Sequence, residues 1–259
     1  MSAIATLRFV RTVRVLVATA SALSASVCLA DEHAHWSYSG VTGPEKWSTL
    51  EHDFGSCALG KTQSPIDIRD VEAREADLPA IDFDYQASPL KIIDNGHTIQ
   101  VNYAPGSFIS VGGRRYELVQ FHFHKPSEEK INGKGYDMVA HLVHKDSDGK
   151  LAVVAVLLES GKTNPLIDTL WSHFPTQKNQ ETVIESANID VADLLPHNHA
   201  YYTFTGSLTT PPCTEGVTWL VLQHSSSVSA AQVARFGSLY PMNARPVQPV
   251  NGRAIQASR

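Results

Sequence analysis

Two histidines at residues 120–124 are spaced so that both could bind one metal ion. The run reads Gln-Phe-His-Phe-His, and alternate side chains of an extended strand point to the same face. His122 and His124 therefore share a face if this run is a strand. A His-x-His pair alone is a weak signal, because most histidines serve hydrogen bonding or a solvated surface.

A third histidine strengthens the metal hypothesis. The run 139–144 is also β-prone, and in a strand His141 and Val143 would lie on one face, with Leu142 and His144 on the other. Two neighbouring strands could then present His122, His124 and His141 to one Zn²⁺, whose fourth tetrahedral position would stay open for water. An open position of this kind is typical of catalytic zinc sites rather than structural ones.

Motifs on both sides of these histidines resemble the α-class carbonic anhydrases. Asn95-Gly96-His97 lies upstream, Pro126-Ser127-Glu128 follows the histidine pair, and residues 206–212 read Gly-Ser-Leu-Thr-Thr-Pro-Pro. The agreement extends from His35-Trp36-Ser37-Tyr38 to residues 243–249, in one order along the chain. Chance does not account for so many colinear motifs. The resemblance implies a zinc enzyme that reversibly hydrates CO₂ to bicarbonate and a proton.

The resemblance makes His122, His124 and His141 the zinc ligands and His97 the proton shuttle. In carbonic anhydrase itself, zinc lowers the pKa of its water to about 7, so hydroxide would be available to attack CO₂ at neutral pH. A histidine can accept and release a proton near neutral pH, which suits His97 to carry the product proton to buffer. On spacing alone, a turn residue after Asn95-Gly96 is the better explanation of His97; the motif match favours the shuttle.

The resemblance also implies roles in orienting the nucleophile and holding the substrate. Thr209 would accept a hydrogen bond from the hydroxide and donate one to Glu128, and a turn role for its Thr-Thr-Pro-Pro segment is compatible with this. Thr210 would contact bicarbonate, chiefly through water. The apolar wall for CO₂ would comprise residues ordinarily assigned to the core: Val143, Val153, Leu208, Val217 and Trp219. The polar side, which would hold ordered water, would comprise Tyr38, Asn95 and Gln100.

The residues that would orient the zinc ligands depart from the family pattern at one place. Gln120 matches a partner that orients a zinc histidine, and such partners often tune metal affinity tenfold or more. In the family, a glutamate often lies two residues before the third ligand, and a histidine often follows the Ser-Glu pair. Here those places hold Val139 and Glu129. We hypothesise that the two residues were exchanged together and that Glu129 is the hydrogen-bond acceptor of His141.

Several adjacent strands are needed to position these side chains, and the sequence predicts them. Runs rich in Val, Ile, Phe and Tyr recur between turn signals such as Gly112-Gly113 and Asn132-Gly133. The strongest helical candidate is 163–174, which opens near Asn164-Pro165. The expected strands are 90–93, 98–103, 108–111, 116–124, 139–144, 151–158 and 217–224. The pattern predicts a mainly β (α+β) fold, and the resemblance implies a single domain with a large, twisted, mostly antiparallel central sheet and short peripheral helices.

Residues 1–30 are predicted to be a secretory signal peptide, followed by one domain over 31–259. Three arginines among the first 14 residues precede an apolar stretch, 15–30, and Cys28-Leu29-Ala30 offers small residues for cleavage. A membrane anchor is the competing interpretation, but the stretch is short for a span. Lipid attachment at Cys28 is disfavoured by the bulk of Val27. A Gram-negative source would make the location periplasmic.

The predicted mature chain is acidic and holds two cysteines. Loss of three arginines and no acidic residues takes the formal charge from −5 to −8 with histidines neutral, so nucleic acid and anionic lipid are poor partner candidates. An even pair of cysteines, Cys57 and Cys213, suggests a disulfide in an exported chain, with two buried free thiols as the alternative. Bacterial members of the resembled family commonly carry this bridge.

Two other functions share part of this pattern. A metal-free, carbonic-anhydrase-like binding module would tolerate loss of zinc ligands, whereas this chain retains all three histidines together with Glu128, Thr209 and His97. A zinc ester hydrolase could use the same hydroxide, and catalytic efficiencies for an ester and for CO₂ would separate the two enzymes. Related bacterial enzymes are often dimers, so the resemblance admits a homodimer, although no motif decides the oligomeric state.

Overall fold

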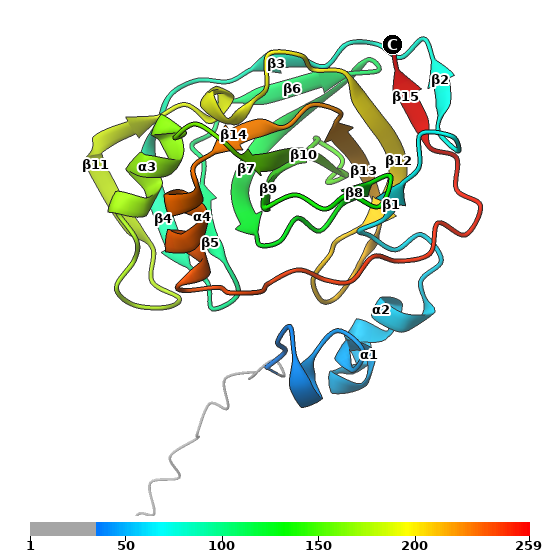
Figure 1. Cartoon of the computed structure of the whole chain (residues 1–259), viewed down its shortest axis with the longest axis horizontal. Helices are drawn as coiled ribbons and strands as arrows, with labels where there is room; N and C mark the ends of the chain where they lie inside the picture. The colour runs from blue at the N-terminus through cyan, green and yellow to red at the C-terminus, as the bar shows by residue number, and fades with distance from the viewer. Residues whose placement is uncertain (1–34) are drawn as a thin grey trace, which may run out of the picture. The chain divides into compact units, whose positions relative to one another are not determined.

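The computed structural model describes residues 35–259, and the predicted signal peptide lies outside them. The described chain is built around one 13-stranded sheet (Figure 1). Its strands are β2 (Arg74–Ala76), β3 (Asp82–Asp84), β4 (Ser88–Asp94), β5 (Ile99–Asn102), β6 (Phe108–Val111), β7 (Arg114–His124), β9 (Met138–Lys145), β10 (Leu151–Ser160), β11 (Thr182–Ile189), β12 (Tyr201–Ser207), β13 (Glu215–Leu222), β14 (Ser226–Val228) and β15 (Gln256–Ser258). A separate parallel pair is formed by β1 (Asp67–Ile68) and β8 (Lys130–Ile131).

The sheet is mostly antiparallel, as expected. Its main path runs β11-β4-β5-β7-β9-β10-β13-β12-β15-β2, while β14 pairs with β10 and β6 joins β3 to β7. Parallel pairing within it is confined to β10–β13, β10–β14 and β15–β2. All seven predicted strands are present with small shifts at their ends. The mainly β fold class is therefore confirmed.

Both faces of the central strands are covered, which explains their nearly continuous apolar sequences. One face packs against the larger core cluster, which includes Phe121, Phe123, Leu142 and Val154. The other face packs in a second cluster around Val153 and Trp219. Along β9 and β10, successive residues therefore alternate between two buried environments rather than between core and solvent.

Two short helices cover the face of the larger core. They are α3 (Pro165–Ser172) and α4 (Ala230–Gly237), which lie side by side in Figure 1, and the Trp171 indole donates to the Gln232 carbonyl at 3.0 Å. Asn164 caps α3, and the reciprocal bonds of Ser229 and Gln232 form a capping box at the start of α4. The helix predicted at 163–174 is confirmed as α3.

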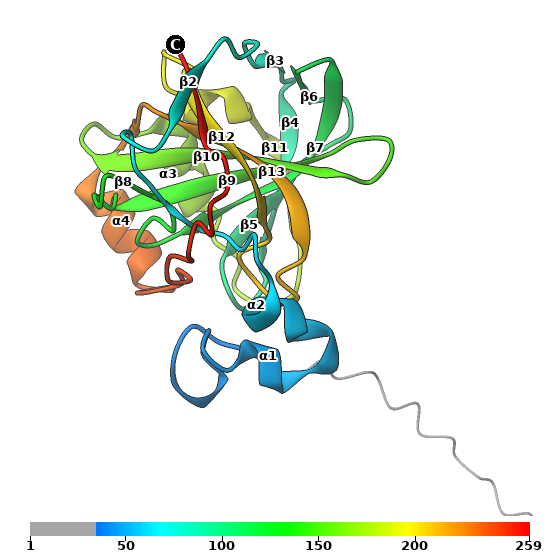
Figure 2. The same cartoon turned by 90° about the vertical axis from the view of Figure 1, so that its right-hand side faces the viewer.

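An N-terminal helical segment is joined covalently to a loop that follows β12. It contains η1 (Gly40–Thr42), α1 (Trp47–Leu50), η2 (His52–Gly55) and α2 (Ser56–Leu59); η3 (Val191–Leu194) lies elsewhere. Both views show α1 and α2 beyond one end of the sheet (Figures 1 and 2). Cys57 of α2 forms a disulfide with Cys213, as predicted. No helix among residues 35–259 has the length and apolar character needed to cross a membrane.

A bulge in β7 determines which side chains face the second cluster. The pairing of β7 with β9 shifts between Leu118 and Gln120, leaving Val119 as the extra residue. Before the bulge, even-numbered residues such as Tyr116 and Leu118 enter the larger core; after it, the odd-numbered Phe121 and Phe123 do. Because a one-residue shift exchanges the two faces of a strand, the bulge turns the even-numbered residues 120, 122 and 124 away from that core.

Candidate metal centre and active site

The three predicted metal-binding histidines meet on adjacent strands. His122 of β7 lies directly opposite His141 of β9 in the antiparallel register, and His124 follows two residues later on the same face of β7. One ring nitrogen from each histidine lies within 4.8 Å of the others. The structure thus brings together three imidazole nitrogens from two strands, with the spacing of a mononuclear metal site.

Each of these histidines uses its other ring nitrogen to bind a protein acceptor. His122 Nδ1 donates to Gln120 Oε1 at 2.8 Å, and His124 Nδ1 donates to the Asn243 carbonyl at 2.7 Å. His141 Nε2 donates to Glu129 Oε1 at 3.0 Å. These bonds leave Nε2 of His122, Nε2 of His124 and Nδ1 of His141 free to bind a metal ion.

The free nitrogens fit a zinc ion. His124 Nε2 is buried and has no hydrogen-bond partner among the described residues, a costly state that a bound cation would relieve. Burial lowers the pKa of His122 to about 3 and that of His124 well below its usual range, which favours the neutral imidazoles that metal binding requires. Three neutral imidazole nitrogens are a donor set that suits Zn²⁺ with one position left open.

Glu129 reaches His141 from the loop between β7 and β8. The side chain is completely buried, and both carboxylate oxygens lie close to His141 Nε2, at 3.0 and 3.1 Å. Burial lowers the pKa of His141, but the charge and hydrogen bond of Glu129 together with the charge of Glu128 outweigh it and raise that pKa overall. The contact expected from the sequence is therefore present, while Val139, the other member of the exchanged pair, lies in the second core cluster.

Glu128 and Thr209 are buried next to the histidines. Glu128 Oε1 accepts the Arg245 backbone N–H at 2.7 Å and lies 3.5 Å from His124 Nδ1. Its Oε2 has no hydrogen bond of good geometry among the described residues, yet the Thr209 hydroxyl is close enough to lower the pKa of the carboxyl. Burial is the larger effect and raises that pKa to about 7.

The five predicted wall residues are gathered in the second core cluster. Val153, Val217 and Trp219 are almost completely buried there, and the half-buried Val143 and Leu208 pack against it. The Trp219 ring meets the His141 ring edge-on at 5.0 Å between centroids. One side of the histidine cluster is therefore apolar, an environment that offers few polar groups to compete for a small uncharged molecule.

The predicted polar residues lie together on another side of the histidines. Tyr38, Asn95, Gln100 and Thr210 line a cavity of about 120 Å³ that also touches His122, His124, Gln120 and His97. Asn95 Nδ2 donates to Gln100 Oε1 at 3.2 Å, so two of these polar side chains bind each other. Burial raises the pKa of Tyr38 well above its usual value, which keeps its phenol protonated.

Three contacts of the site residues had no role in the sequence analysis. The Asn243 carbonyl binds His124, the Arg245 backbone binds Glu128, and the Trp36 ring stacks on His97. Trp36 and residues 243–249 lie within the motifs that carry the family resemblance. Main-chain acceptors and donors have no residue signature, so only that likeness pointed to the C-terminal segment.

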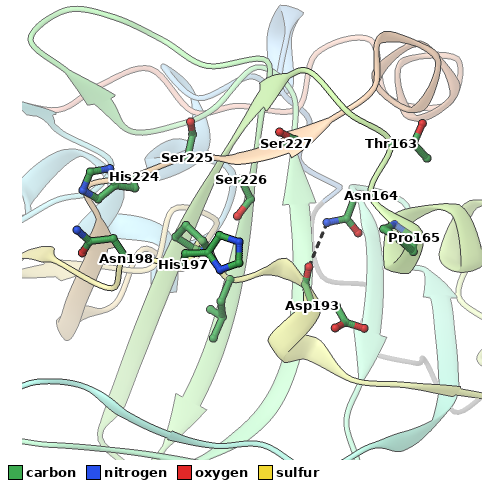
Figure 3. Close-up of a pocket in the computed structure, with 12 residues that line it drawn as sticks. Thr163, Asn164, Pro165, Asp193, His197, Asn198, His224, Ser225, Ser226 and Ser227 are labelled. Carbon is green, nitrogen blue, oxygen red and sulfur yellow. Dashed lines mark hydrogen bonds between the residues drawn. The ribbon is translucent and has the colours of Figure 1, made fainter.

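Histidines without a predicted ligand role do not form a second metal centre. A separate cavity of about 410 Å³ is lined by His197, His224 and Asp193 near the start of α3, where Asn164 donates to the Asp193 carbonyl at 3.1 Å (Figure 3). Among residues 35–259, the only cluster of three metal-binding groups is that of His122, His124 and His141.

The site belongs to a domain with well-characterised relatives. Residues 42–259 match the family model described as eukaryotic-type carbonic anhydrase. A carbonic anhydrase of Neisseria gonorrhoeae is 43% identical over 254 residues, covering 96% of this chain and 98% of the relative. A carbonic anhydrase of Pectobacterium carotovorum is 42% identical over 238 residues, covering 90% of this chain and 96% of the relative.

A solved structure shares the fold closely. The α-carbonic anhydrase of Thermovibrio ammonificans, determined with the inhibitor sulfanilamide, superposes with a TM-score of 0.83 at 42% identity. The match covers 86% of this chain and 99% of that one. The large mixed sheet and the few short helices are therefore common to both proteins.

Proposed function

The chain belongs to the eukaryotic-type, or α, carbonic anhydrase family, and we propose that it hydrates CO₂ with a zinc ion bound by His122, His124 and His141. The family implies the reversible conversion of CO₂ to bicarbonate and a proton, with a small molecule as substrate. The zinc ion and the roles of individual residues are the finer part of the proposal, and each is argued below from contacts of the site.

The orientation of the three imidazoles is the observation that carries the proposal. Each ring donates its remaining N–H to a fixed acceptor, which aims one unprotonated nitrogen at a common point. Such acceptors hold both the tautomer and the ring angle of a metal-binding histidine. Bound zinc would supply a hydroxide nucleophile near neutral pH, as in carbonic anhydrase itself, where the pKa of the zinc water is about 7.

Thr209 and Glu128 would orient that nucleophile. A carboxylate can only accept hydrogen bonds, so a Thr209 hydroxyl that donates to Glu128 presents its oxygen lone pairs to the nucleophile. The Arg245 N–H already occupies Glu128 Oε1, which leaves Oε2 as the acceptor for Thr209. The nucleophile would thus point its own lone pair toward a CO₂ molecule held by the apolar wall, with Thr210 contacting bicarbonate through water.

His97 would carry the proton released by the reaction out of the site. It lines the same cavity as His122 and His124 and lies beside the polar residues Asn95 and Gln100. Burial lowers its pKa to about 4, below the usual histidine value, so the ring is neutral at pH 7 and would hold a transferred proton only briefly before passing it on. Ordered water between these polar side chains would link the metal to His97.

Stopped-flow CO₂ hydration tests the proposal, with zinc measured on the same protein. We expect rapid hydration by the wild type and about one zinc ion per chain, as for a single three-histidine site. His122→Ala should lose both the zinc and the hydration, whereas the exposed His224→Ala should lose neither. Zinc-free wild-type protein, or His122→Ala with wild-type activity, would contradict the zinc mechanism. A higher catalytic efficiency for an ester than for CO₂ would identify an ester hydrolase instead.

We further propose that the protein is exported to the periplasm. The disulfide between Cys57 and Cys213 is compatible with an oxidising compartment. Expression of the complete chain in a Gram-negative host should yield periplasmic protein that begins at Asp31. Mass spectrometry would measure this end, and cytoplasmic protein that retains residues 1–30 would contradict the prediction.

A further inference from the structure

His97 lies between an inner and an outer cavity. The inner one, of about 120 Å³, also contacts His122 and His124, whereas the outer one, of about 640 Å³, contacts His35 and Lys178 but none of the metal-binding histidines. A proton that reaches His97 from the metal centre therefore has a second space to cross before it reaches bulk solvent. The groups that line the outer cavity decide how it leaves.

The His97 ring is held in place on one face. Trp36 stacks on it with 3.6 Å between ring centroids and 5° between planes. Trp36 is in turn packed edge-on against the buried Trp47, whose indole donates to the Ser37 carbonyl at 2.8 Å. The His97 main chain is fixed as well, because its N–H donates to Asn95 and its carbonyl accepts from Asn243. Because the ring is held in place, we expect it to transfer the proton to a second group rather than rotate out to solvent.

His35 is placed to be that second group. Its ring meets the His97 ring edge-on, with 6.0 Å between centroids and 89° between planes, so the two imidazoles are neighbours at the outer cavity. His35 Nδ1 donates to the Trp36 carbonyl at 2.8 Å, and because a carbonyl can only accept, the neutral ring keeps its proton on Nδ1. Nε2 is then unprotonated, and the side chain is exposed to solvent.

The charges around the pair favour movement of a proton outward from His97. Burial is the main cause of the lowered pKa of His97. The charge of Lys178 lowers that pKa further and Asp94 opposes it, while His35 lowers it only when its own ring is protonated. The main chain of Lys178 is held beside Asp94, as the neighbouring Asn179 N–H donates to the Asp94 carbonyl at 2.6 Å. Glu51 and Asp53 line the outer cavity together with His35, and their carboxylates favour a positive charge in that cavity.

We propose that His35 is a second proton carrier, in series with His97, and that Trp36 positions the His97 ring for this transfer. His97 gives up the proton through an intervening water, His35 Nε2 accepts it, and His35 then releases it to buffer, so that both rings return to the neutral state. From the sequence, His35 was expected only to open the His35-Trp36-Ser37-Tyr38 motif, with no chemical role. This inference rests on the proposed CO₂ hydration and adds a residue to its proton path.

The test separates proton export from the chemical step. Stopped-flow hydration in weak buffer should give His35→Gln a kcat on the order of fivefold below the wild type, with kcat/KM unchanged. Imidazole added as a diffusible carrier should restore kcat, which it would not do for a structural defect. His52→Gln, which removes an exposed histidine from neighbouring η2, is the matched control and should match the wild type.

A double variant tests whether the two histidines act in series. His35→Gln in a His97→Gln background should cause no further loss of kcat, because the chain of transfer is already broken. A further loss of the same size would overturn the serial relay, as would wild-type kcat for His35→Gln alone. If the wild-type zinc protein fails to hydrate CO₂, both the proposed function and the relay are wrong. If it hydrates CO₂ and the kcat of His35→Gln equals that of the wild type, only the relay is wrong.

Discussion

Glu129 orients His141 from a loop, although the other acceptor positions lie on β7 itself or on the C-terminal segment. A carboxylate beside a metal-binding imidazole makes that imidazole a better ligand and fixes its angle. Both Glu129 oxygens lie within 3.1 Å of His141 Nε2, and the side chain is shielded from water. Its effect on the metal should therefore be large.

Replacing this carboxylate should weaken zinc binding. For Glu129→Gln we expect a loss of zinc affinity of about 10- to 100-fold, because the amide carries no charge with which to polarise His141. Competition with a chromogenic chelator measures the affinity directly. Glu159→Gln, which removes a half-buried carboxylate of β10 that pairs with Lys134, controls for the change in net charge. Equal zinc affinities for Glu129→Gln and the wild type would show that Glu129 is not the partner that tunes the metal.

Residue spacing together with the family resemblance predicted which imidazoles meet. The alternation of a strand placed His122 and His124 on one face, and the structure shows them there opposite His141. The hydrogen-bond acceptor of His124 could not be predicted in the same way. It is the main-chain carbonyl of Asn243, 119 residues away, and any residue type supplies such a carbonyl.

At the scale of an element, β9 carries a buried histidine on each face. His141 faces the candidate metal centre, while His144 is completely buried on the opposite side, where Tyr85 binds its Nε2 at 2.9 Å. Burial lowers the pKa of His144 to about 3. The folded protein thus holds this ring neutral, whereas an unfolded chain would protonate it near pH 6.5.

This difference predicts a loss of stability in acid. Because the folded pKa is the lower one, stability falls as the pH drops from about 6.5 toward 3, and by pH 5 the contribution of His144 is a loss of about 2 kcal/mol. Urea unfolding at pH 7 and pH 5 should show a smaller decrease in stability for His144→Gln than for the wild type, by about that amount. The exposed His224→Gln should behave like the wild type. An equal decrease for His144→Gln would contradict the assignment.

The strands and helices differ in how well their sequences predict them. The strands expected at 139–144 and 151–158 are buried on both faces, and their apolar runs indicated this. The segment β12 is rich in Tyr, Thr and Phe, and α4 opens with a Ser-x-x-Gln capping pattern, so both carried signals that the analysis did not use. By contrast, β11 is mostly exposed and irregularly paired with β4, and its sequence shows no clear alternation.

At the scale of the whole domain, one disulfide ties the N-terminal helical segment to the loop that carries Thr209 and Thr210. Cys213 lies three residues after Thr210, beyond Pro211 and Pro212, and its partner Cys57 lies in α2, 156 residues earlier in the chain. The buried Arg245 reinforces the same junction, since its guanidinium donates to the Cys57 carbonyl at 2.9 Å and to Gln63 Oε1 at 2.9 Å.

Removing this link should lower global stability. For Cys57→Ser/Cys213→Ser we expect a decrease of about 2–5 kcal/mol in the free energy of unfolding, because the bridge closes a long loop in the unfolded chain. Urea denaturation of the variant and of the wild type, with and without reductant, measures it. The reductant should affect the wild type only. Equal stability of oxidised wild type and variant would mean that the bridge adds nothing to the fold.

The extra residue at Val119 has a consequence for how mutations are tolerated along β7. Before Val119, polar substitutions should prevent folding at positions 116 and 118, whose side chains lie in the larger core. After Val119, the sensitive positions should be 121 and 123. If every residue of β7 were substituted in turn and each variant were tested for folding, every second position should be sensitive to polar residues. The sensitive positions should change from even-numbered to odd-numbered at 119. Deleting Val119 would restore one continuous alternation and exchange the two faces of the strand beyond it. His122 and His124 would then point into the larger core, and Phe121 and Phe123 toward the candidate metal centre.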